Sequence, residues 1–290
     1  MWYLVAVSII WAFSFGLIKT YLAGLDPFVV SGLRIGVALV VFLPFLRFKR
    51  VPAGLFWKLF LIGSIQFGLM YGAYIYTFQF MEAHKIALFT VTTPLLVTLF
   101  DDLLEKRFQR HYFLCAALAV LGALVIYYKT IDLSNTLIGI LLLQLSNLCF
   151  AVGQVLYRRI MLQNQELKSR DHFGILYLGG LVATVVLVLL GTNLETVSIT
   201  MRQLQVILFL GALASGLGFF LWNYGATKTN AGTLAVMNNL KIPLAVVVSL
   251  LFFESVSSEA LVRLLIGGAI IVGAVYLNER ITASLKRESS

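Results

Sequence analysis

The sequence contains little charge for its length. Only 12% of its 290 residues are Asp, Glu, Lys or Arg, whereas soluble domains have about 25%. The hydrophobic share is 60%, and a chain folded in water could not bury that much apolar surface. This shortage of charge excludes an ordinary soluble domain and indicates an all-α integral membrane protein.

Cysteine, histidine and nucleotide-binding motifs are also scarce. The two cysteines, Cys115 and Cys149, lie in apolar runs, which favours a role as small core residues over a disulfide. The three histidines are scattered along the chain, so no cluster predicts a metal site, and no cofactor is expected. No Walker-type phosphate loop occurs, which argues against transport driven by ATP on this chain.

Ten apolar runs are each long enough to cross the roughly 30 Å hydrocarbon core of a bilayer as a helix. The first run lacks the basic start and the small-residue cleavage site of a signal peptide, so we expect it to remain as a membrane span. The predicted spans are residues 2–18, 27–47, 55–80, 84–104, 112–128, 137–157, 173–191, 204–226, 233–253 and 260–278.

Basic residues punctuate these runs. They are not gathered into one domain, which argues against a nucleic-acid-binding protein despite the net charge of +9. Cytoplasmic loops of membrane proteins are enriched in Lys and Arg. With a cytoplasmic N-terminus, fifteen of the 22 basic residues face the cytoplasm, five face outward, and Arg34 and Lys241 lie within spans. The bias predicts that both termini are cytoplasmic, in a bacterial inner membrane.

Two segments of the chain resemble each other. Residues 83–105 read AHKIALFTVTTPLLVTLFDDLLE and residues 232–254 read GTLAVMNNLKIPLAVVVSLLFFE, which aligns Pro94 with Pro243. The repeat predicts two five-helix halves, residues 1–130 and 131–290, within a single membrane domain. Because five is odd, the two halves enter the membrane from opposite sides. Such inverted repeats are typical of secondary transporters that work by alternating access.

This pattern resembles the drug/metabolite transporter superfamily, and within it the EamA-like transporters. The likeness depends on the order and spacing of SIIWAFSFGLIK, DPFVVSGLRIGVALVVFLPFL, TTPLLVTLFDDLLE and KIPLAVVVSLLFFE. It implies an exporter or exchanger of small organic metabolites, driven by an ion gradient or by the substrate's own gradient. It also implies a cavity lined by spans 1, 3, 4, 6, 8 and 9, with spans 5 and 10 peripheral.

The chain departs from many of these relatives at one position. They have an acidic residue before the second proline, whereas this chain has Lys241-Ile242-Pro243. In this respect it is more similar to members of the carboxylate, amino acid and amine group. The resemblance therefore implies that the substrate is an amino acid or a carboxylate.

Lys241 lies near the middle of its apolar run, where a charge costs about 2.5–3.5 kcal/mol. Pro243 cannot donate a helical hydrogen bond to the carbonyl of Asn239, which predicts a loosened helix. Together with Asn238 on the same face, this site suits a carboxylate, and a buried ammonium leaves proton or ion coupling open. The alternatives are that Lys241 extends toward the cytoplasmic end or pairs with an acidic neighbour for packing.

Polar and aromatic residues on the other spans predict an amphipathic cavity. The alternative is that the amides join helices and the aromatic rings fill gaps. Pro94 and Pro243 are predicted gating or structural residues. Arg34 is predicted to be a packing or topology determinant, or to form an outer-gate ion pair with Glu82. The predicted substrate-binding residues are Trp11, Tyr71, Tyr74, Gln144, Asn147, Trp222, Asn223, Asn238 and Lys241.

Two other functions fit parts of the sequence. Asp101, Asp102 and Glu105 have the spacing of a magnesium–diphosphate site in a membrane prenyltransferase, but no second acidic motif accompanies them. We therefore expect a solvated helix end and no enzyme. A non-transporting scaffold is the other alternative. Small residues four apart predict close helix packing, in a monomer or a homodimer: Ala119 with Ala123, and Ala269 with Gly273.

Overall fold

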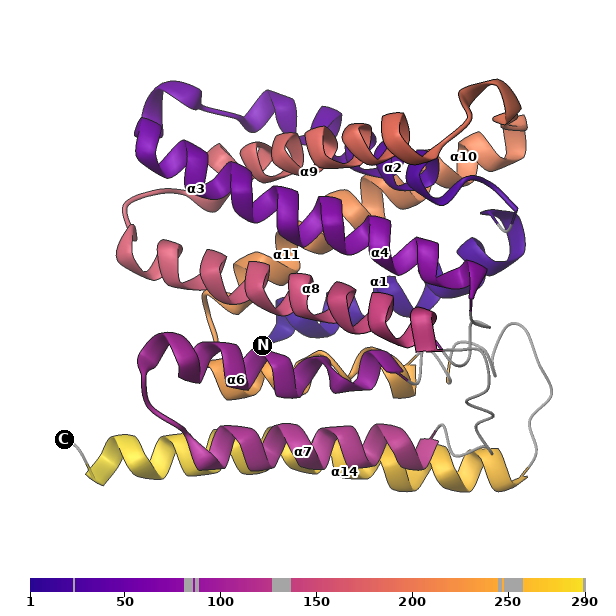
Figure 1. Cartoon of the computed structure of the whole chain (residues 1–290). Helices are drawn as coiled ribbons and strands as arrows, with labels where there is room; N and C mark the ends of the chain where they lie inside the picture. The colour runs from indigo at the N-terminus through magenta and orange to yellow at the C-terminus, as the bar shows by residue number, and fades with distance from the viewer. Residues whose placement is uncertain are drawn as a thin grey trace.

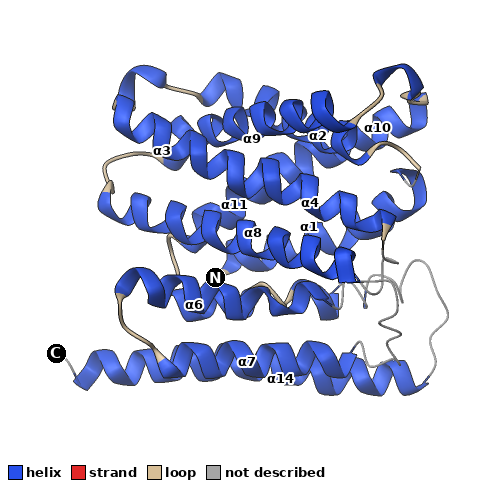
Figure 2. Ribbon diagram, in the orientation of Figure 1, coloured by secondary structure: helices blue, strands red, loops and turns tan. Residues whose placement is uncertain are grey.

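The computed structural model describes the chain except for residues 23, 81–85, 87–88, 127–136, 245–246, 248–257 and 289–290. Every described element is a helix, and the helices lie side by side in one bundle (Figures 1 and 2). Within the described residues, six helical segments are long and apolar enough to cross a membrane. The all-α membrane fold expected from the hydropathy is confirmed.

The described helices follow the predicted spans in order. Spans 3 and 8 each consist of two α-helices joined by a π-helical turn, and a further π-helical turn ends span 1. The bounds are α1 Trp2–Leu17, α2 Pro27–Phe42, α3 Ala53–Gly63, η4 Ser64–Leu69, α4 Met70–Tyr76, α6 Thr93–Glu105, α7 Arg110–Ile126, α8 Leu137–Gln163, α9 Ser169–Gly191, α10 Met201–Leu210, η8 Gly211–Leu217, α11 Gly218–Ala226, α12 Ala231–Met237 and α14 Ser258–Glu288.

The start of α2 shows how a local signal fixes a helix end. Asp26 Oδ1 accepts hydrogen bonds from the N–H groups of Phe28 and Val29, both at 2.9 Å, and Pro27 needs no donor at the first position. The same oxygen accepts a bond from Thr192 Oγ1 at 2.9 Å, just after α9. The cap therefore also joins spans 2 and 7.

The repeat is visible in the backbone geometry. The π-helical turns η4 and η8 begin at Ser64 and Gly211, 147 residues apart, close to the spacing of 149 between the aligned prolines. Tyr71 and Phe219 follow these turns, and their ring centroids lie 5.5 Å apart. π-helical turns are rare and are frequent at functional sites. Equivalent turns thus bring one aromatic residue of each half together.

The two halves run in opposite directions. Figure 1 shows α1 running from left to right and α8 from right to left. Tyr3, near the start of α1, packs against Tyr224 near the end of α11, with ring centroids 4.9 Å apart. Arg158, near the end of α8, donates to the carbonyl of Thr229 just after α11 at 3.0 Å. The start of α1 and the end of α8 therefore lie at the same end of the bundle.

The last helices of the two halves, α7 and α14, pack along each other at one edge (Figure 1). A Cβ at Gly122 would lie 2.7 Å from the carbonyl oxygen of Gly267, so the two backbones touch. Ala119 and Ala123 are fully buried, whereas a Cβ at Gly273 would meet nothing within 4 Å. The small residues of α7 thus serve packing within the chain.

Span 4 is less regular than the sequence suggested. Residues 81–85 and 87–88, including Glu82, lie outside the described residues. A 3-10 turn, Thr90–Thr92, precedes α6, which begins at Thr93. Pro94 therefore occupies the first turn of a helix, where its missing N–H costs nothing. The predicted single helix over residues 84–104, with Pro94 near its middle, is therefore interrupted just before the proline.

Span 9 is interrupted before its proline. α12 ends at Met237, and residues 238–240 form a turn through i→i−3 backbone hydrogen bonds of 3.1 Å. The N–H of Ile242 then donates to the carbonyl of Asn239 at 3.0 Å. The carbonyl of Asn239, to which Pro243 cannot donate, is therefore not left free, because the turn supplies another donor. The break still separates Lys241 from the preceding helix.

Candidate functional site

A cavity of about 90 Å³ lies between the two halves. Its lining residues come from spans 1, 2, 3, 4, 6, 8 and 9, so span 2 joins the six spans that the family resemblance implied. Aromatic rings and hydroxyl groups make up much of the wall. Five of the nine predicted substrate-binding residues line it: Trp11, Tyr71, Tyr74, Asn147 and Lys241.

Lys241 presents its ammonium group to this cavity. Its Nζ lies 5.7 Å from the centroid of the Trp11 ring, within the range of a cation–π contact. Within the described part of the chain, no carboxylate lies within ion-pair distance of Nζ. The cation is therefore offset by an aromatic face and not by an acid among these residues.

Arg34, predicted to be a packing, topology or outer-gate residue, also lines the cavity. The side chain is only 2% exposed although it lies in the second turn of α2. Its Nε donates to Ser215 Oγ at 3.2 Å, and its guanidinium carbon lies 5.0 Å from the centroid of the Tyr71 ring. Glu82, the predicted partner of Arg34, lies outside the described residues.

Hydrogen bonds hold the other lining residues in place. Trp11 Nε1 donates to the carbonyl of Ala214 at 3.0 Å, across the two halves. Tyr71 Oη lies 3.2 Å from Ser215 Oγ. Asn147 Nδ2 donates to the carbonyl of Phe89 at 3.0 Å. Backbone and side-chain partners therefore fix the positions of these lining groups in this conformation.

The wall also contains hydroxyl residues that were not among the predicted site residues. Thr93 Oγ1 donates to the carbonyl of Thr90 at 2.8 Å, and Ser146 Oγ donates to the carbonyl of Met70 at 3.0 Å. A single hydroxyl in an apolar run produces no periodic signal, so their position follows only from the packing. The missed residues are Ser14, Thr90, Thr93 and Ser146.

Two predicted residues, Trp222 and Asn238, lie in the layer beneath the cavity. Trp222 Nε1 donates to Gln154 Oε1 at 2.9 Å, and Asn238 Nδ2 lies 3.4 Å from the same oxygen. All three side chains are at most 1% exposed. Trp222 also packs against Trp11, with ring centroids 5.0 Å apart. We call Trp222, Gln154 and Asn238 the floor of the cavity.

Gln144 and Asn223 are not among the lining residues either. Gln144 Nε2 donates to the carbonyl of Phe89 at 3.2 Å, and its Oε1 accepts a bond from Thr92 Oγ1 at 2.8 Å. Asn223 Nδ2 donates to the carbonyl of Phe219 at 3.0 Å in its own helix. Gln144 therefore joins span 6 to span 4, whereas the hydrogen bond of Asn223 stays within its own helix.

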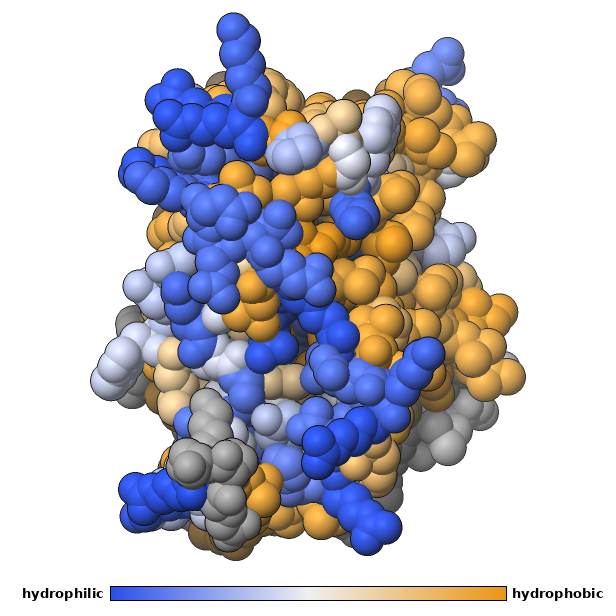
Figure 3. All heavy atoms as spheres, turned by 90° about the vertical axis from the view of Figure 1, so that its left-hand side faces the viewer, coloured by the Kyte–Doolittle hydropathy of each residue, from blue (hydrophilic) through white to orange (hydrophobic). Residues whose placement is uncertain are grey.

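The cavity lies toward one end of the bundle. Ile18 follows α1, Tyr74 lies near the end of α4, and Arg34 lies near the start of α2. These positions are remote from the loops rich in Lys and Arg, whose end of the bundle we call the basic end. Figure 3 faces that end, and hydrophilic residues run across it. The floor therefore separates the cavity from the basic end.

A second hollow, of about 550 Å³, opens at the basic end between α8, α9 and α11. Its cations are Lys168, Arg170 and Lys228, and all three are exposed. Lys228 Nζ lies 5.3 Å from the ring centroid of Tyr224. Exposed ammonium groups are hydrated and bind anions weakly. None of the predicted residues lines this hollow, so the inner cavity is the candidate site.

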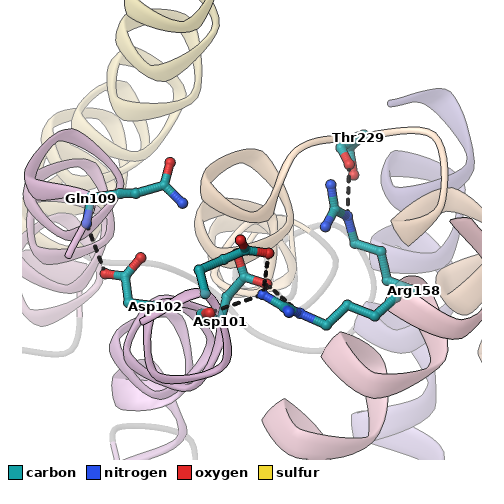
Figure 4. A network of polar contacts seen from close by, with 7 residues as sticks. Asp101, Asp102, Gln109, Arg158 and Thr229 are labelled. Atoms are coloured by element: carbon teal, nitrogen blue, oxygen red, sulfur yellow. Dashed lines mark hydrogen bonds and ion pairs between the residues drawn. The ribbon is translucent and has the colours of Figure 1, made fainter. Parts of the chain in front are cut away.

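The acidic motif at the end of α6 forms ion pairs. Arg159 Nη2 lies 3.0 Å from Asp101 Oδ1 and 2.7 Å from Glu105 Oε1. Asp102 Oδ2 instead accepts a bond from the N–H of Gln109 at 3.2 Å (Figure 4). Among the described residues, no group of three potential metal ligands occurs. Asp101 and Glu105 therefore converge on Arg159, whereas Asp102 bonds Gln109, so the three carboxylates that suggested a magnesium–diphosphate site are each engaged by protein partners.

Comparisons with known proteins agree with this architecture. The model of the EamA-like transporter family matches residues 1–128 and again residues 137–280. A solved crystal structure has the same fold, with a TM-score of 0.78 at 16% identity over 96% of each chain.

Several proteins with similar sequences have names that specify a substrate. A "Probable biotin transporter" of Pseudomonas aeruginosa is 41% identical, covering 96% of this chain and 97% of that protein. The "Biotin transporter" of Salmonella typhimurium is 37% identical, covering 96% and 92%. The "Biotin transporter" of Escherichia coli is 40% identical, covering 85% and 83%. The resemblance seen in the sequence is confirmed: the chain belongs to the EamA-like transporter family and is an integral membrane transporter.

Proposed function

We propose that this protein carries biotin across a bacterial inner membrane as a secondary active transporter. The observation that carries the proposal is Lys241, an ammonium group in an aromatic cavity with no acidic partner among the described residues. Biotin has a carboxylate at one end and an apolar ring system at the other. Relatives 37–41% identical over nearly the whole chain are named biotin transporters. Biotin is a carboxylate, so the proposal narrows the class expected from the sequence.

Alternating access between two inverted halves, residues 1–130 and 131–290, is the mechanism that we propose. Ligand pockets usually have volumes of about 300–1,000 Å³, and this cavity has about 90 Å³. It therefore has to widen to admit biotin. With both termini in the cytoplasm, the cavity belongs to the outer half of the membrane, and the floor of Trp222, Gln154 and Asn238 must open for passage to the cytoplasm.

Uptake of labelled biotin into proteoliposomes tests the proposal, with a pH gradient present or absent to identify proton coupling. We expect the wild-type protein to accumulate biotin and Lys241→Met to lose most of this uptake. Lys58→Met is the matched control, because Lys58 is an exposed cation outside the cavity. Absence of biotin uptake by the wild type, or full uptake by Lys241→Met, would contradict the proposal. A protein that carries no solute at all would favour the scaffold alternative.

A further inference from the structure

Arg34 has donor groups that the protein itself does not use. Its Nε is engaged by Ser215, and its guanidinium lies over Tyr71. Among the described residues, no hydrogen bond or ion pair reaches its two Nη groups. A guanidinium has five N–H donors in a fixed plane. Four of them therefore remain available beside the cavity.

The two cations of the cavity are separated by aromatic rings. Lys241 contacts Trp11, whose ring centroid lies 5.7 Å from that of Phe219. Phe219 contacts Tyr71 at 5.5 Å, and Tyr71 contacts Arg34. All five residues line the same cavity. An apolar ligand can therefore lie along the rings with a cation near each of its ends.

We propose that Arg34 is a second substrate-contacting residue, which donates to the ureido carbonyl oxygen of biotin while Lys241 binds the carboxylate. This inference rests on the proposed function and adds the orientation of the substrate. The aromatic series of Trp11, Phe219 and Tyr71 then packs against the apolar rings and chain between the two polar ends.

The chemistry of the two cations decides which end each one takes. Both cations face an aromatic ring, but Lys241 also lacks a hydrogen-bond acceptor among the described residues, so its ammonium group is the less compensated of the two and attracts an anion. Arg34 is held in plane by Ser215 and partly offset by Tyr71. The remaining N–H donors of Arg34 are fixed in one plane, where they can bond the in-plane lone pairs of the ureido carbonyl oxygen. Buried donors of this kind also reject ligands that lack the acceptor.

Ligand analogues test each end separately. The first is biotinol, in which the carboxylate is reduced to an alcohol. The second is the diamino acid, in which the ureido carbonyl has been removed. Binding of each to detergent-purified protein is measured by competition against labelled biotin. For the wild type we expect each analogue to bind about tenfold more weakly than biotin, or worse. Biotinol loses the charge-assisted hydrogen bond to Lys241, and the diamino acid loses the acceptor for Arg34 and gains an ammonium group that Arg34 repels.

Substitution of either cation should then remove the preference for biotin over one of the two analogues. Lys241→Met should bind biotin and biotinol equally and still reject the diamino acid. Arg34→Gln should bind biotin and the diamino acid more nearly equally and still prefer biotin to biotinol. The opposite assignment of preferences would overturn the proposed orientation. Unchanged preferences in Arg34→Gln would overturn the role of Arg34.

Two further measurements keep the inference testable if Arg34→Gln does not fold. Arg34→Lys keeps the charge but has fewer planar donors, so we expect it to fold and to discriminate less against the diamino acid. Wild-type protein that binds the diamino acid as tightly as biotin would overturn the inference without any variant. Failure of the wild type to bind biotin would overturn the proposed function itself. If the wild type binds biotin but does not prefer it to biotinol and to the diamino acid, only the inference about substrate orientation is overturned.

Discussion

Arg159 of α8 and Asp101 of α6 form an ion pair that joins the two halves at the basic end. Arg159 Nε and Nη2 lie 3.2 Å and 3.0 Å from the same Asp101 oxygen, and Nη2 also donates to the Asp101 carbonyl at 3.0 Å. Figure 4 shows that the neighbouring Arg158 turns its guanidinium away from Asp101, toward the carbonyl of Thr229. Arg158 and Arg159 thus connect α8 to the segment after α11 and to α6, respectively.

We expect Asp101→Asn to lower the free energy of unfolding by about 2 kcal/mol, because the carboxylate is only 6% exposed and its charge is paired at close range. Glu105→Gln is the control. The Glu105 side chain is 54% exposed, and such surface pairs contribute about 1 kcal/mol or less. Thermal unfolding in detergent measures both variants. Equal losses of stability in the two variants would show that burial does not determine how strongly the Asp101–Arg159 pair stabilises the protein. If the double variant Asp101→Arg with Arg159→Asp regains stability, this would further support the ion pair as the source of the stabilisation.

Gly63→Ala should prevent close packing of α3 against α9. A Cβ at Gly63 would lie 1.9 Å from the carbonyl oxygen of Leu176, a backbone atom that cannot rotate away. Overpacking of this kind costs about 1–3 kcal/mol or more. A Cβ at Gly54, in the same helix, would meet nothing within 4 Å, so Gly54→Ala is the matched control. Yield and thermal stability should fall only for Gly63→Ala. Similar stability of the two variants would contradict the observed approach of the helices.

Gln154→Met should destabilise the floor of the cavity. The change leaves the buried Trp222 Nε1 without its acceptor, which costs about 1–3 kcal/mol. Gln165→Met is the control, because Gln165 is exposed and bonds only the carbonyl of Leu162. Surface substitutions usually change stability by about 0.5 kcal/mol or less. If the two variants melt at the same temperature, the hydrogen bonds of the floor do not stabilise this conformation.

Cysteine labelling can test the direction in which the cavity faces. With both termini in the cytoplasm, Ile18 is reached from outside, so a membrane-impermeant maleimide should label Ile18→Cys in intact cells. Ala226→Cys is the control, because Ala226 is fully buried at the other end of the bundle. The wild type provides the blank, since Cys115 and Cys149 are buried. Labelling of Ile18→Cys only after the cells are opened would reverse the predicted orientation. Protection by biotin would support the proposed site.

Prediction of individual site residues from the sequence depended on helix rotation. Asn147 and Trp222 both looked like members of a polar face, yet Asn147 lines the cavity while Trp222 lies beneath it. A periodic pattern identifies the face that avoids lipid, but that face is shared by cavity residues and packing residues. Arg34 stood alone in its run, so no pattern related it to Ser215, 181 residues away.

The sequence by itself determined the membrane class, the series of spans and the family. The physical reason is local: within lipid each span must satisfy its own backbone hydrogen bonds as a helix, so length and hydropathy are enough to reveal it. Only the tertiary structure decided that Arg34 and Lys241 share a cavity, that Asp101 meets Arg159, and that span 9 breaks before its proline. These features depend on contacts between segments far apart in the chain, where the packing of each helix against its neighbours sets its rotation and depth.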